Sequence, residues 1–378
     1  MRVVLDVSAI PARPAGAGQY VLRLVEALGQ GIDPALELVL VARRDDGDRW
    51  RALAPAAAVS ALAPAGRPAR LAWEQARGRA VAHRLGADVW HGPHYTMPLA
   101  LGLPLGRRPV PAVVTVHDLT FFDHPELHER SKVPYFRAMT RLAARRAAAL
   151  VCVSRATADR LDALLHPRVP VVVAPHGIDT DRFRPVGHPA VDDGADAAVL
   201  SALGVRPPFI AFVGTLEPRK NVAGLVRAAE RLPAGTTLVL AGQEGWGTGG
   251  LDEAVARSTG SVVRLGYVAD GVVPVLYRRA AAVAYPALVE GFGLPALEAL
   301  ACGARLVTTS GTAMAALVGD AAALVPPGDD EALAHALAEA VAGRGPDPSA
   351  GPATAAPFTW RASAERHLEA YRLAWGRT

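Results

Sequence analysis

The segment AAVAYPALVEGFGLPALEALACG, residues 281–303, contains one complete strand–loop–helix unit. Its first part, AAVAYPA (281–287), is a short apolar run typical of a buried strand. Pro295 suits the first turn of a helix, and Gly303 suits the position just after a helix ends. The segment therefore predicts a strand, a glycine-containing loop and a helix in immediate succession, which is the repeating unit of parallel α/β sheets.

The same alternation of apolar runs and amphipathic stretches extends in both directions along the chain. Continuous apolar strands separated by helices predict parallel sheets with both faces covered. In such sheets, ligands bind outside the carboxyl ends of the strands. The predicted strands are 3–7, 36–42, 88–91, 112–118, 149–154 and 169–175 in a first series, and 209–215, 236–242, 261–267, 281–287, 305–310 and 322–326 in a second.

One segment rich in Pro, Gly and Asp, from about Arg184 to Pro208, interrupts this alternation and is interpreted as an interdomain linker. We therefore expect two tandem, doubly wound Rossmann-like α/β domains that face a deep cleft. The predicted boundaries are 1–185 for the N-terminal domain, 186–207 for the linker and 208–358 for the C-terminal domain. Residues 359–378 form a final helix.

The composition is that of an ordinary globular protein, with 51% apolar and 20% charged residues in 378. The net charge of +4 gives no ground for a nucleic-acid surface. No apolar run is long enough to span a bilayer, so a cytoplasmic protein is expected. The two cysteines, Cys152 and Cys302, lie in apolar segments and are expected to be buried free thiols.

The segment VGTLEPRKN (213–221) follows the first strand of the second series. Gly214 allows the backbone to turn and approach a ligand closely. Arg219 and Lys220 then stand at the beginning of a helix, a position that suits a phosphate. The alternative is a solvated helix start with incidental charge.

Weaker signals of the same kind occur in the first half of the chain. Gly16 and Gly18 follow the first strand and open a helix, although Val21 stands where a dinucleotide fingerprint has its third glycine. His117, followed by an aspartate, ends a strand, and we expect it to hydrogen-bond a polar ligand. Further histidines in similar positions are His91, His94 and His176.

Two charged stretches need separate interpretation. Asp46 and Asp48 have the D-x-D spacing that some sugar transferases use for a divalent metal, but arginines surround them. A charged surface loop is the simpler interpretation, and no metal site is predicted. A basic helix over 130–146 carries arginines at i, i+4 spacing, a face that suits anionic lipid or a lipid-linked phosphate. An ordinary solvated face is the simpler alternative there too.

The two acids of the opening segment, Glu290 and Glu298, invite comparison with a glycosidase pair. Glu290 lies in the loop, whereas Glu298 lies one turn inside the predicted helix. Nothing else in the chain supports hydrolysis. The intervening Gly-Phe-Gly exposes backbone N–H groups at a helix start, which again suits phosphate.

At this point the segment EGFGLPALEALACG resembles the E-x7-E motif of glycosyltransferase family 4, retaining enzymes with the GT-B fold. Other segments are similar to that family in the family's order, so the resemblance covers nearly the whole chain. They are VHDL, CVSRATADRL, PHGID, FVGTLEPRKNVAGLVRA and LGYVAD. The resemblance implies that the N-terminal domain binds the acceptor and the C-terminal domain the nucleotide sugar. It also implies that the last helix crosses back onto the N-terminal domain.

The resemblance also implies a role for each matching residue. Glu290 and His117 would contact the donor sugar, and Arg219 and Lys220 would neutralise the leaving diphosphate. The remaining contacts with the donor would come from Gly16, Gly18, Gly214, Val268, Phe292, Gly293, Leu294 and Glu298, the last holding the ribose. His176 stands where many members of the family have Asn. This departure bears on which sugar the donor carries, and not on the reaction.

A retaining hexosyltransferase that needs neither a metal nor another cofactor is therefore expected, with GDP-mannose as the best donor. Its acceptor would be a glycan, a lipid-linked molecule or a small molecule. In the family, the leaving phosphate is thought to take the acceptor's proton, so no protein base is required. The alternatives are a UDP-sugar-dependent transferase, a sugar-nucleotide epimerase or phosphorylase-like relative on the same two-domain scaffold, and a non-catalytic module that binds sugars, lipids or sugar nucleotides.

Overall fold

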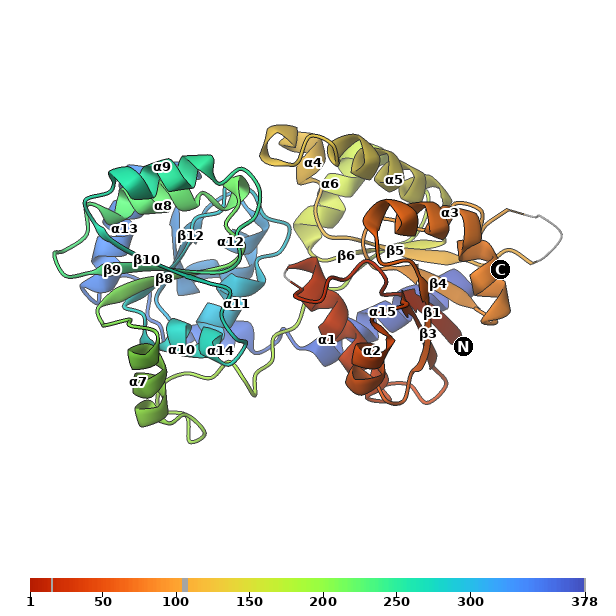
Figure 1. Ribbon diagram of the computed structural model, residues 1–378, viewed down its shortest axis with the longest axis horizontal. Coiled ribbons are helices and arrows are strands. Elements are labelled where there is room, and N and C mark those ends of the chain that lie inside the picture. The colour runs from red at the N-terminus through yellow and green to blue at the C-terminus, as the bar shows by residue number, and fades with distance from the viewer. Residues whose placement is uncertain (15, 104–107, 377–378) are drawn as a thin grey trace. The chain divides into compact units, whose positions relative to one another are not determined.

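The computed structural model describes residues 1–14, 16–103 and 108–376. The chain divides into two compact units, each built on its own parallel sheet (Figure 1). The N-terminal unit comprises Met1–Gly177 together with the C-terminal segment that begins at Trp360, and the C-terminal unit comprises Ile178–Thr359. The prediction of two doubly wound α/β domains in tandem is confirmed.

The N-terminal unit contains a seven-stranded sheet in the order β3-β2-β1-β4-β5-β6-β7, with parallel pairing throughout. The strands are β1 (Arg2–Asp6), β2 (Glu37–Arg43), β3 (Ala58–Ala63), β4 (Val89–Gly92), β5 (Ala112–Val116), β6 (Ala149–Cys152) and β7 (Val171–Val173). The helices are α1 (Ala17–Gly29), α2 (Gly47–Leu53), α3 (Arg67–Arg84), α4 (Thr120–Asp123), α5 (Val133–Arg146), α6 (Arg155–Leu165) and α15 (Trp360–Trp375).

Alternate residues of these strands face opposite sides of the sheet, so the unit has two hydrophobic layers. Val3 and Leu5 of β1 pack into a layer with α1, α2 and α15, whereas Val4 packs into a layer with α3, α5 and α6. This double burial explains the continuous apolar runs of the central strands. Ser154 caps α6, its side chain accepting the N–H of Thr157 at 3.0 Å.

The C-terminal unit contains a six-stranded parallel sheet in the order β10-β9-β8-β11-β12-β13. The strands are β8 (Phe209–Val213), β9 (Thr237–Ala241), β10 (Ser261–Gly266), β11 (Ala282–Tyr285), β12 (Leu306–Thr309) and β13 (Ala322–Val325). The helices are α7 (Asp193–Ala202), α8 (Val222–Ala229), α9 (Gly249–Arg257), α10 (Val272–Arg279), α11 (Leu294–Ala301), α12 (Ala313–Val318), α13 (Asp330–Val341) and α14 (Ala350–Ala355). Helices α8, α9 and α13 cover one face of the sheet, and α10, α11 and α14 cover the other (Figure 1).

Residues 186–207, expected as a linker, contain the helix α7 and lie wholly within the C-terminal unit. The Asp192 side chain starts α7 by accepting the N–H groups of Gly194 and Ala195. Asp196 then fixes α7 to α10, accepting from Arg278 at 2.6 Å. The chain passes between units at 177/178 and 359/360 instead, and α15 packs in the N-terminal unit against α1, β6 and β7.

Hydrogen bonds between buried polar side chains join α15 to the N-terminal sheet. Tyr20 of α1 contacts His367 of α15 at 2.7 Å and Thr115 of β5 at 2.9 Å. His91 of β4 contacts the same threonine at 2.8 Å, and Tyr371 of α15 at 2.8 Å. We call Tyr20, His91, Thr115, His367 and Tyr371 the His–Tyr chain.

The strand order reverses at one point in each sheet. In the C-terminal unit this switch point lies between β8 and β11, and in the N-terminal unit between β1 and β4. The loops that leave adjacent strands at a switch point run to opposite faces of the sheet, and a crevice forms between them. Residues at the carboxyl ends of β8, β11, β1 and β4 are therefore the first candidates for ligand contact.

Candidate active site

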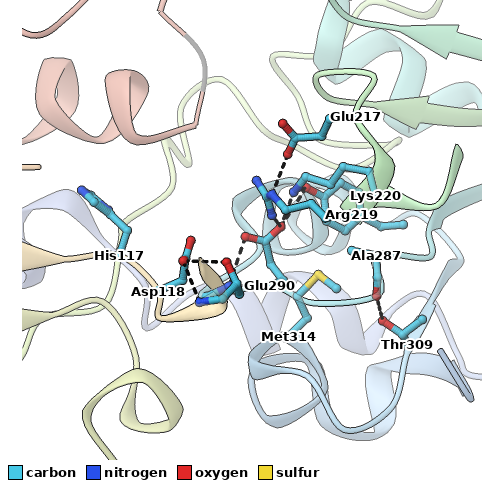
Figure 2. Close-up of polar contacts among 12 residues, drawn as sticks. His117, Asp118, Glu217, Arg219, Lys220, Ala287, Glu290, Thr309 and Met314 are labelled. Atoms are coloured by element: carbon cyan, nitrogen blue, oxygen red, sulfur yellow. Dashed lines mark hydrogen bonds and ion pairs between the residues drawn. The ribbon is translucent and has the colours of Figure 1, made fainter. Parts of the chain in front are cut away.

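The loops after β8 and β11 bring three of the predicted catalytic residues into contact. Arg219 and Lys220 lie on a short 3₁₀ turn, Pro218–Lys220, and Glu290 lies between β11 and α11. Arg219 Nη1 donates to Glu290 Oε2 at 3.0 Å, and Lys220 Nζ donates to the same oxygen (Figure 2). The two loops are also joined by their backbones, because Leu288 N donates to Arg219 O at 2.8 Å.

Two further side chains complete this ionic cluster. Glu217 Oε1 lies 2.6 Å from Arg219 Nε, and Tyr285 OH accepts from Lys220 Nζ. The Tyr285 ring lies parallel to that of Phe212, with ring centroids 5.8 Å apart, so β8 and β11 hold the hydroxyl in place. Neither Glu217 nor Tyr285 was predicted as a site residue from the sequence. Glu217 could have been predicted, because it is an acid two residues before the Arg-Lys pair. Tyr285 could not, because the sequence around it indicates only a strand.

Charge and burial fix the protonation state of the cluster. Burial of Glu290 raises its pKa, but Lys220 and Arg219 lower it more strongly, to about 2. Burial lowers the pKa of Lys220, and the neighbouring Arg219 lowers it further, while Glu290 and Glu217 raise it. Lys220 is only 6% exposed, so its charge depends on these carboxylates for compensation.

The charges of the cluster balance one another, since two cations face two carboxylates. A diphosphate placed here would accept hydrogen bonds from the same guanidinium and ammonium groups that now contact Glu290 and Glu217. Charge-assisted bonds of this kind are the strong ones in phosphate recognition. The arrangement therefore suits a group that gains negative charge beside a fixed pair of cations.

The start of α11 provides backbone donors beside the cluster. Gly293 precedes α11 with φ +98°, and Leu294 is its first residue. A Cβ at Gly293 would lie 2.1 Å from Cγ of Met314, which is fully buried, so only glycine fits. The first amides of a helix have no intrahelical acceptor and point along the positive end of the helix dipole.

The remaining predicted contacts of the C-terminal unit are placed as follows. Phe292 is buried, with its ring against that of Phe358. Glu298 is half-buried on α11, one turn beyond the helix start, and accepts from Tyr277 OH at 3.4 Å. Gly214 follows β8 and donates its N–H to Ala241 O at 2.9 Å. Val268 is half-buried in the segment after β10.

The predicted residues of the N-terminal unit lie after β1 and β5. Gly16 precedes α1 with φ +50°, and a Cβ at Gly18 would lie 2.7 Å from Cβ of Pro14, so both positions favour glycine. His117 Nε2 contacts Pro93 O at 2.8 Å. Because a carbonyl can only accept, Nε2 carries a proton. Burial lowers the pKa of His117, which leaves a neutral ring with Nδ1 as the acceptor.

The two charged stretches are largely engaged in local contacts. Asp46 accepts from Arg49 Nη2 at 2.5 Å and from Trp50 Nε1 at 3.1 Å, and Asp48 accepts from Arg51 at 2.6 Å. Across the described ranges, no group of three or more His, Cys, Asp or Glu side chains is placed to hold a metal ion.

On α5, Arg137 donates to the carbonyls of Phe121 and Phe122, so this member of the basic face has a structural role. Within the same described ranges, no helix is both long enough and apolar enough to cross a bilayer.

Both halves of the chain match family models. Residues 14–182 match Glycosyltransferase Family 4, and residues 207–342 match Glycosyl transferases group 1. The O-antigen chain mannosyltransferase B of Escherichia coli is 30% identical over 295 residues, which are 75% of this chain and 74% of that protein. The D-inositol 3-phosphate glycosyltransferase of Mycobacteroides abscessus is 35% identical over 237 residues, 59% of this chain and 48% of that protein.

Solved structures resemble the whole chain. The sucrose-phosphate synthase of Thermosynechococcus elongatus has a TM-score of 0.78 at 20% identity and covers 100% of both chains. HepE of Anabaena, solved with UDP and glucose, has a TM-score of 0.76 at 20% identity and covers 98% of both chains. The likeness to these proteins establishes the two-domain GT-B fold. With the matches to both family models, it follows that the chain belongs to glycosyltransferase family 4 and is a glycosyltransferase.

Proposed function

We propose that the protein transfers a hexose from a nucleoside-diphosphate sugar to an acceptor with retention of configuration at the anomeric carbon. The observation that carries the proposal is the ionic cluster of Arg219, Lys220 and Glu290 beside the start of α11. GDP-mannose is the proposed donor, supported by the mannosyltransferase relative. A UDP-sugar is the second candidate, supported by HepE, which was solved in complex with UDP-glucose.

The proposed chemistry is stabilisation of the leaving group. When the bond between the anomeric carbon and the phosphate oxygen breaks, negative charge grows on the diphosphate. Ion pairs with Glu217 and Glu290 already hold the side chains of Arg219 and Lys220 in position. These two cations would therefore need little reorganisation to stabilise the negative charge of the diphosphate. The amides at the start of α11 would add further donors.

Glu290 has two roles in this proposal. Its negative charge favours the protonated form of the buried Lys220. Its carboxylate would also accept hydrogen bonds from the hydroxyl groups of the donor sugar near the reacting carbon. The acceptor's hydroxyl would attack on the face that the diphosphate leaves, and its proton would pass to the departing phosphate. The proposal therefore requires neither a protein base nor a metal.

The two lysines of the chain provide a matched test. Lys220 is buried in the ionic cluster, whereas Lys132 is half-buried and pairs with Glu129. Release of nucleoside diphosphate from GDP-mannose and from UDP-glucose would be measured for Lys220→Ala and Lys132→Ala. We expect Lys220→Ala to lower kcat roughly a hundredfold or more, as removal of one electrostatic contact at a reacting centre does. Lys132→Ala should leave kcat unchanged.

Two results would contradict the proposal. Equal turnover in both lysine variants would remove Lys220 from the chemistry. Loss of turnover on dialysis against EDTA, with recovery on adding Mg²⁺ or Mn²⁺, would show that a metal neutralises the diphosphate. The anomeric configuration of the product, read by NMR, decides between retention and inversion.

A further inference from the structure

The two cations of the ionic cluster share one partner, and each also has a second one. Glu290 Oε2 accepts from both Arg219 and Lys220. Arg219 Nε also lies 2.6 Å from Glu217 Oε1, within its own loop. Lys220 Nζ donates in addition to Tyr285 OH, which belongs to the strand β11. The second partner of Lys220 is therefore a hydroxyl, where that of Arg219 is a carboxylate.

Packing and backbone contacts fix the position of Tyr285. Its buried ring lies parallel to that of Phe212 on the neighbouring strand β8. On the other side of β11, Thr308 Oγ1 of β12 donates to Tyr285 O at 2.8 Å. Lys220 Nζ lies 4.6 Å from the centroid of the Tyr285 ring, so the ammonium contacts the aromatic ring as well as the hydroxyl. The ammonium is thus held by a side chain that three adjacent strands keep in place.

The Tyr285 hydroxyl connects Lys220 with Glu290. Its oxygen accepts from Lys220 Nζ, and the hydroxyl donates to Glu290 Oε2 at 3.4 Å. Burial raises the pKa of Tyr285 well above its ordinary value, and the charge of Glu290 raises it further. The group therefore stays a phenol, and it accepts from Lys220 without adding a negative charge beside an incoming diphosphate.

In the proposed reaction, Glu290 would have to share its carboxylate between Lys220 and the donor. The sugar hydroxyls would donate to it, and the diphosphate would compete with it for the ammonium of Lys220. A buried ammonium that loses its carboxylate partner is destabilised unless another acceptor remains. Tyr285 OH is such an acceptor, because the packing of β8, β11 and β12 keeps it in place whichever anion Lys220 contacts.

We propose that Tyr285 is a positioning residue of the transfer reaction, whose hydroxyl holds Lys220 in place while the ammonium passes from Glu290 to the diphosphate. The inference rests on the proposed function, because Tyr285 acts through Lys220 on the leaving group. A phenylalanine at this position would keep the ring against Phe212 and the contact between ring and ammonium. It would remove only the hydroxyl, so Tyr285→Phe isolates the proposed role.

Steady-state release of nucleoside diphosphate from GDP-mannose and from UDP-glucose measures this variant. We expect Tyr285→Phe to lower kcat roughly tenfold or more and to change the donor KM little, because a hydrogen bond to a charged group is lost where the leaving group gains charge. The alkaline limb of the kcat profile should move to lower pH, since the ammonium loses an acceptor that favours its charged form.

The two lysines of the chain allow a measurement that does not depend on turnover. With ¹³C at the lysine Cε position, the NMR spectrum contains one signal from Lys220 and one from Lys132. In Tyr285→Phe, the Lys220 signal should titrate at lower pH than in the unaltered protein. The Lys132 signal should titrate as before, because Lys132 pairs with Glu129 in the N-terminal unit.

Tyr371→Phe is the matched control for loss of a buried tyrosine hydroxyl. Tyr371 is fully buried in the N-terminal unit, and its hydroxyl contacts His91 at 2.8 Å. This variant should leave both kcat and the titration of Lys220 unchanged. A double variant tests whether Tyr285 acts through the ammonium. Tyr285→Phe combined with Lys220→Ala should lower kcat no further than Lys220→Ala alone.

Three results would overturn the inference. They are an unchanged kcat or Lys220 titration in Tyr285→Phe, an equal fall in kcat for Tyr285→Phe and Tyr371→Phe, and full additivity in the double variant. Failure of the proposed function would be seen separately, as a Lys220→Ala variant that still turns over a donor sugar normally.

Discussion

Glu290 and Glu298 have different surroundings although only seven residues separate them. Glu290 contacts two cations in a buried cluster, whereas Glu298 is half-buried on α11 and contacts a tyrosine hydroxyl. Removal of a charge from the cluster affects the place where the leaving group would gain charge. In the proposed reaction, Glu298 would hold the ribose of the donor, a group that is bound equally before and during the transfer. The two acids should therefore differ in the kinetic constant that they control.

We expect Glu290→Gln to lower kcat roughly a hundredfold or more and to change the donor KM little. Glu298→Gln should raise the donor KM about tenfold at nearly unchanged kcat, because it removes one hydrogen bond from a charged group. Steady-state release of nucleoside diphosphate measures both constants. Circular dichroism controls for unfolding, since Glu290→Gln also breaks the ion pairs of Lys220 and Arg219. The reverse pattern would exchange the two roles.

Gly293 offers a second test at the scale of single residues. Gly293 and Gly311 both have positive φ, +98° and +69°, but only a Cβ at Gly293 would overlap another side chain. Gly311→Ala should cost about 1 kcal/mol of unfolding free energy through backbone strain alone. Gly293→Ala should cost about 1–3 kcal/mol more, because Met314 is fully buried and cannot move aside freely.

Urea unfolding of the two glycine variants measures this difference. Met314→Ala removes the overlapping side chain, so the double variant should recover part of the loss that Gly293→Ala causes. Equal costs at Gly293 and Gly311 would mean that Met314 does not restrict the start of α11.

The parts of the candidate site that lie at strand ends and glycine turns could be predicted from the sequence. Arg219, Lys220 and Glu290 could be selected because they follow strands, and the structure brings them together. Tyr285 could not, because its part depends on which loop pairs with which across β8 and β11. Such contacts between distant segments leave no local pattern in the chain.

At the scale of elements, the sequence-based prediction was wrong for two segments, strand β3 and helix α7, because their composition is untypical of a strand or a helix. Strand β3, AVSALA, was not predicted, because alanine and serine have little strand preference and only its last residue is buried. Helix α7 was hidden in a segment interpreted as linker, although Asp192 provides a start signal and Gly204 an end signal. The remaining twelve strands were predicted from their apolar runs, which are longest in the central strands because these are buried on both faces.

Helix α15 is held by polar contacts whose donors and acceptors can be assigned. His367 Nδ1 lies 2.7 Å from Ser363 O, so Nδ1 donates and Nε2 accepts from Tyr20 OH. The Tyr20 oxygen then accepts from Thr115, which leaves the Thr115 oxygen to accept from His91 Nε2. The last link follows, since His91 Nδ1 must accept from Tyr371. The complete set of bonds in the His–Tyr chain therefore requires both histidines to be neutral, because His367 Nε2 and His91 Nδ1 must each accept a hydrogen bond.

This requirement predicts that acid releases α15. Burial lowers the pKa of His367 to about 4 and that of His91 well below its ordinary value. An unfolded histidine has a pKa of about 6.5, so between about pH 6.5 and 4 the unfolded chain binds more protons than the folded one. The stabilisation is complete above about pH 6.5 and is lost as the pH falls through this window.

Hydrogen exchange of α15 amides between pH 7 and 4.5, corrected for intrinsic rates, measures the effect. His367→Gln keeps an acceptor for Tyr20 but cannot titrate, so its pH dependence should be weaker than that of the unaltered protein. His124→Gln alters an exposed histidine outside the His–Tyr chain and serves as the control. An identical pH dependence in all three proteins would show that the chain does not control the docking of α15.

For the whole molecule, the order of strands and helices indicated two parallel sheets, and the structure confirms them. The boundary between the units was harder to predict. The C-terminal unit begins at 178 in an irregular segment, with no helix or strand to mark the position, and it also ends in an irregular segment at 359. The cleft between the units remains a prediction of the family resemblance. It can be tested by asking which unit responds to a nucleotide.

A nucleotide that binds only the folded protein stabilises it by about 2.7 kcal/mol at a concentration one hundred times Kd. If GDP or UDP contacts the C-terminal unit alone, hydrogen exchange should slow only in the segments 214–221 and 291–298. If its diphosphate also reaches the glycine loop of the N-terminal unit, the amides of residues 16–20 should slow as well. We expect both, because Gly16 is exposed at the start of α1, where the first amides of the helix have no intrahelical acceptor. Slower hydrogen exchange in the C-terminal unit alone would show that Gly16 and Gly18 are not part of the donor site. In the variant Gly18→Ala, nucleotide should still slow exchange in the C-terminal unit but no longer at residues 16–20.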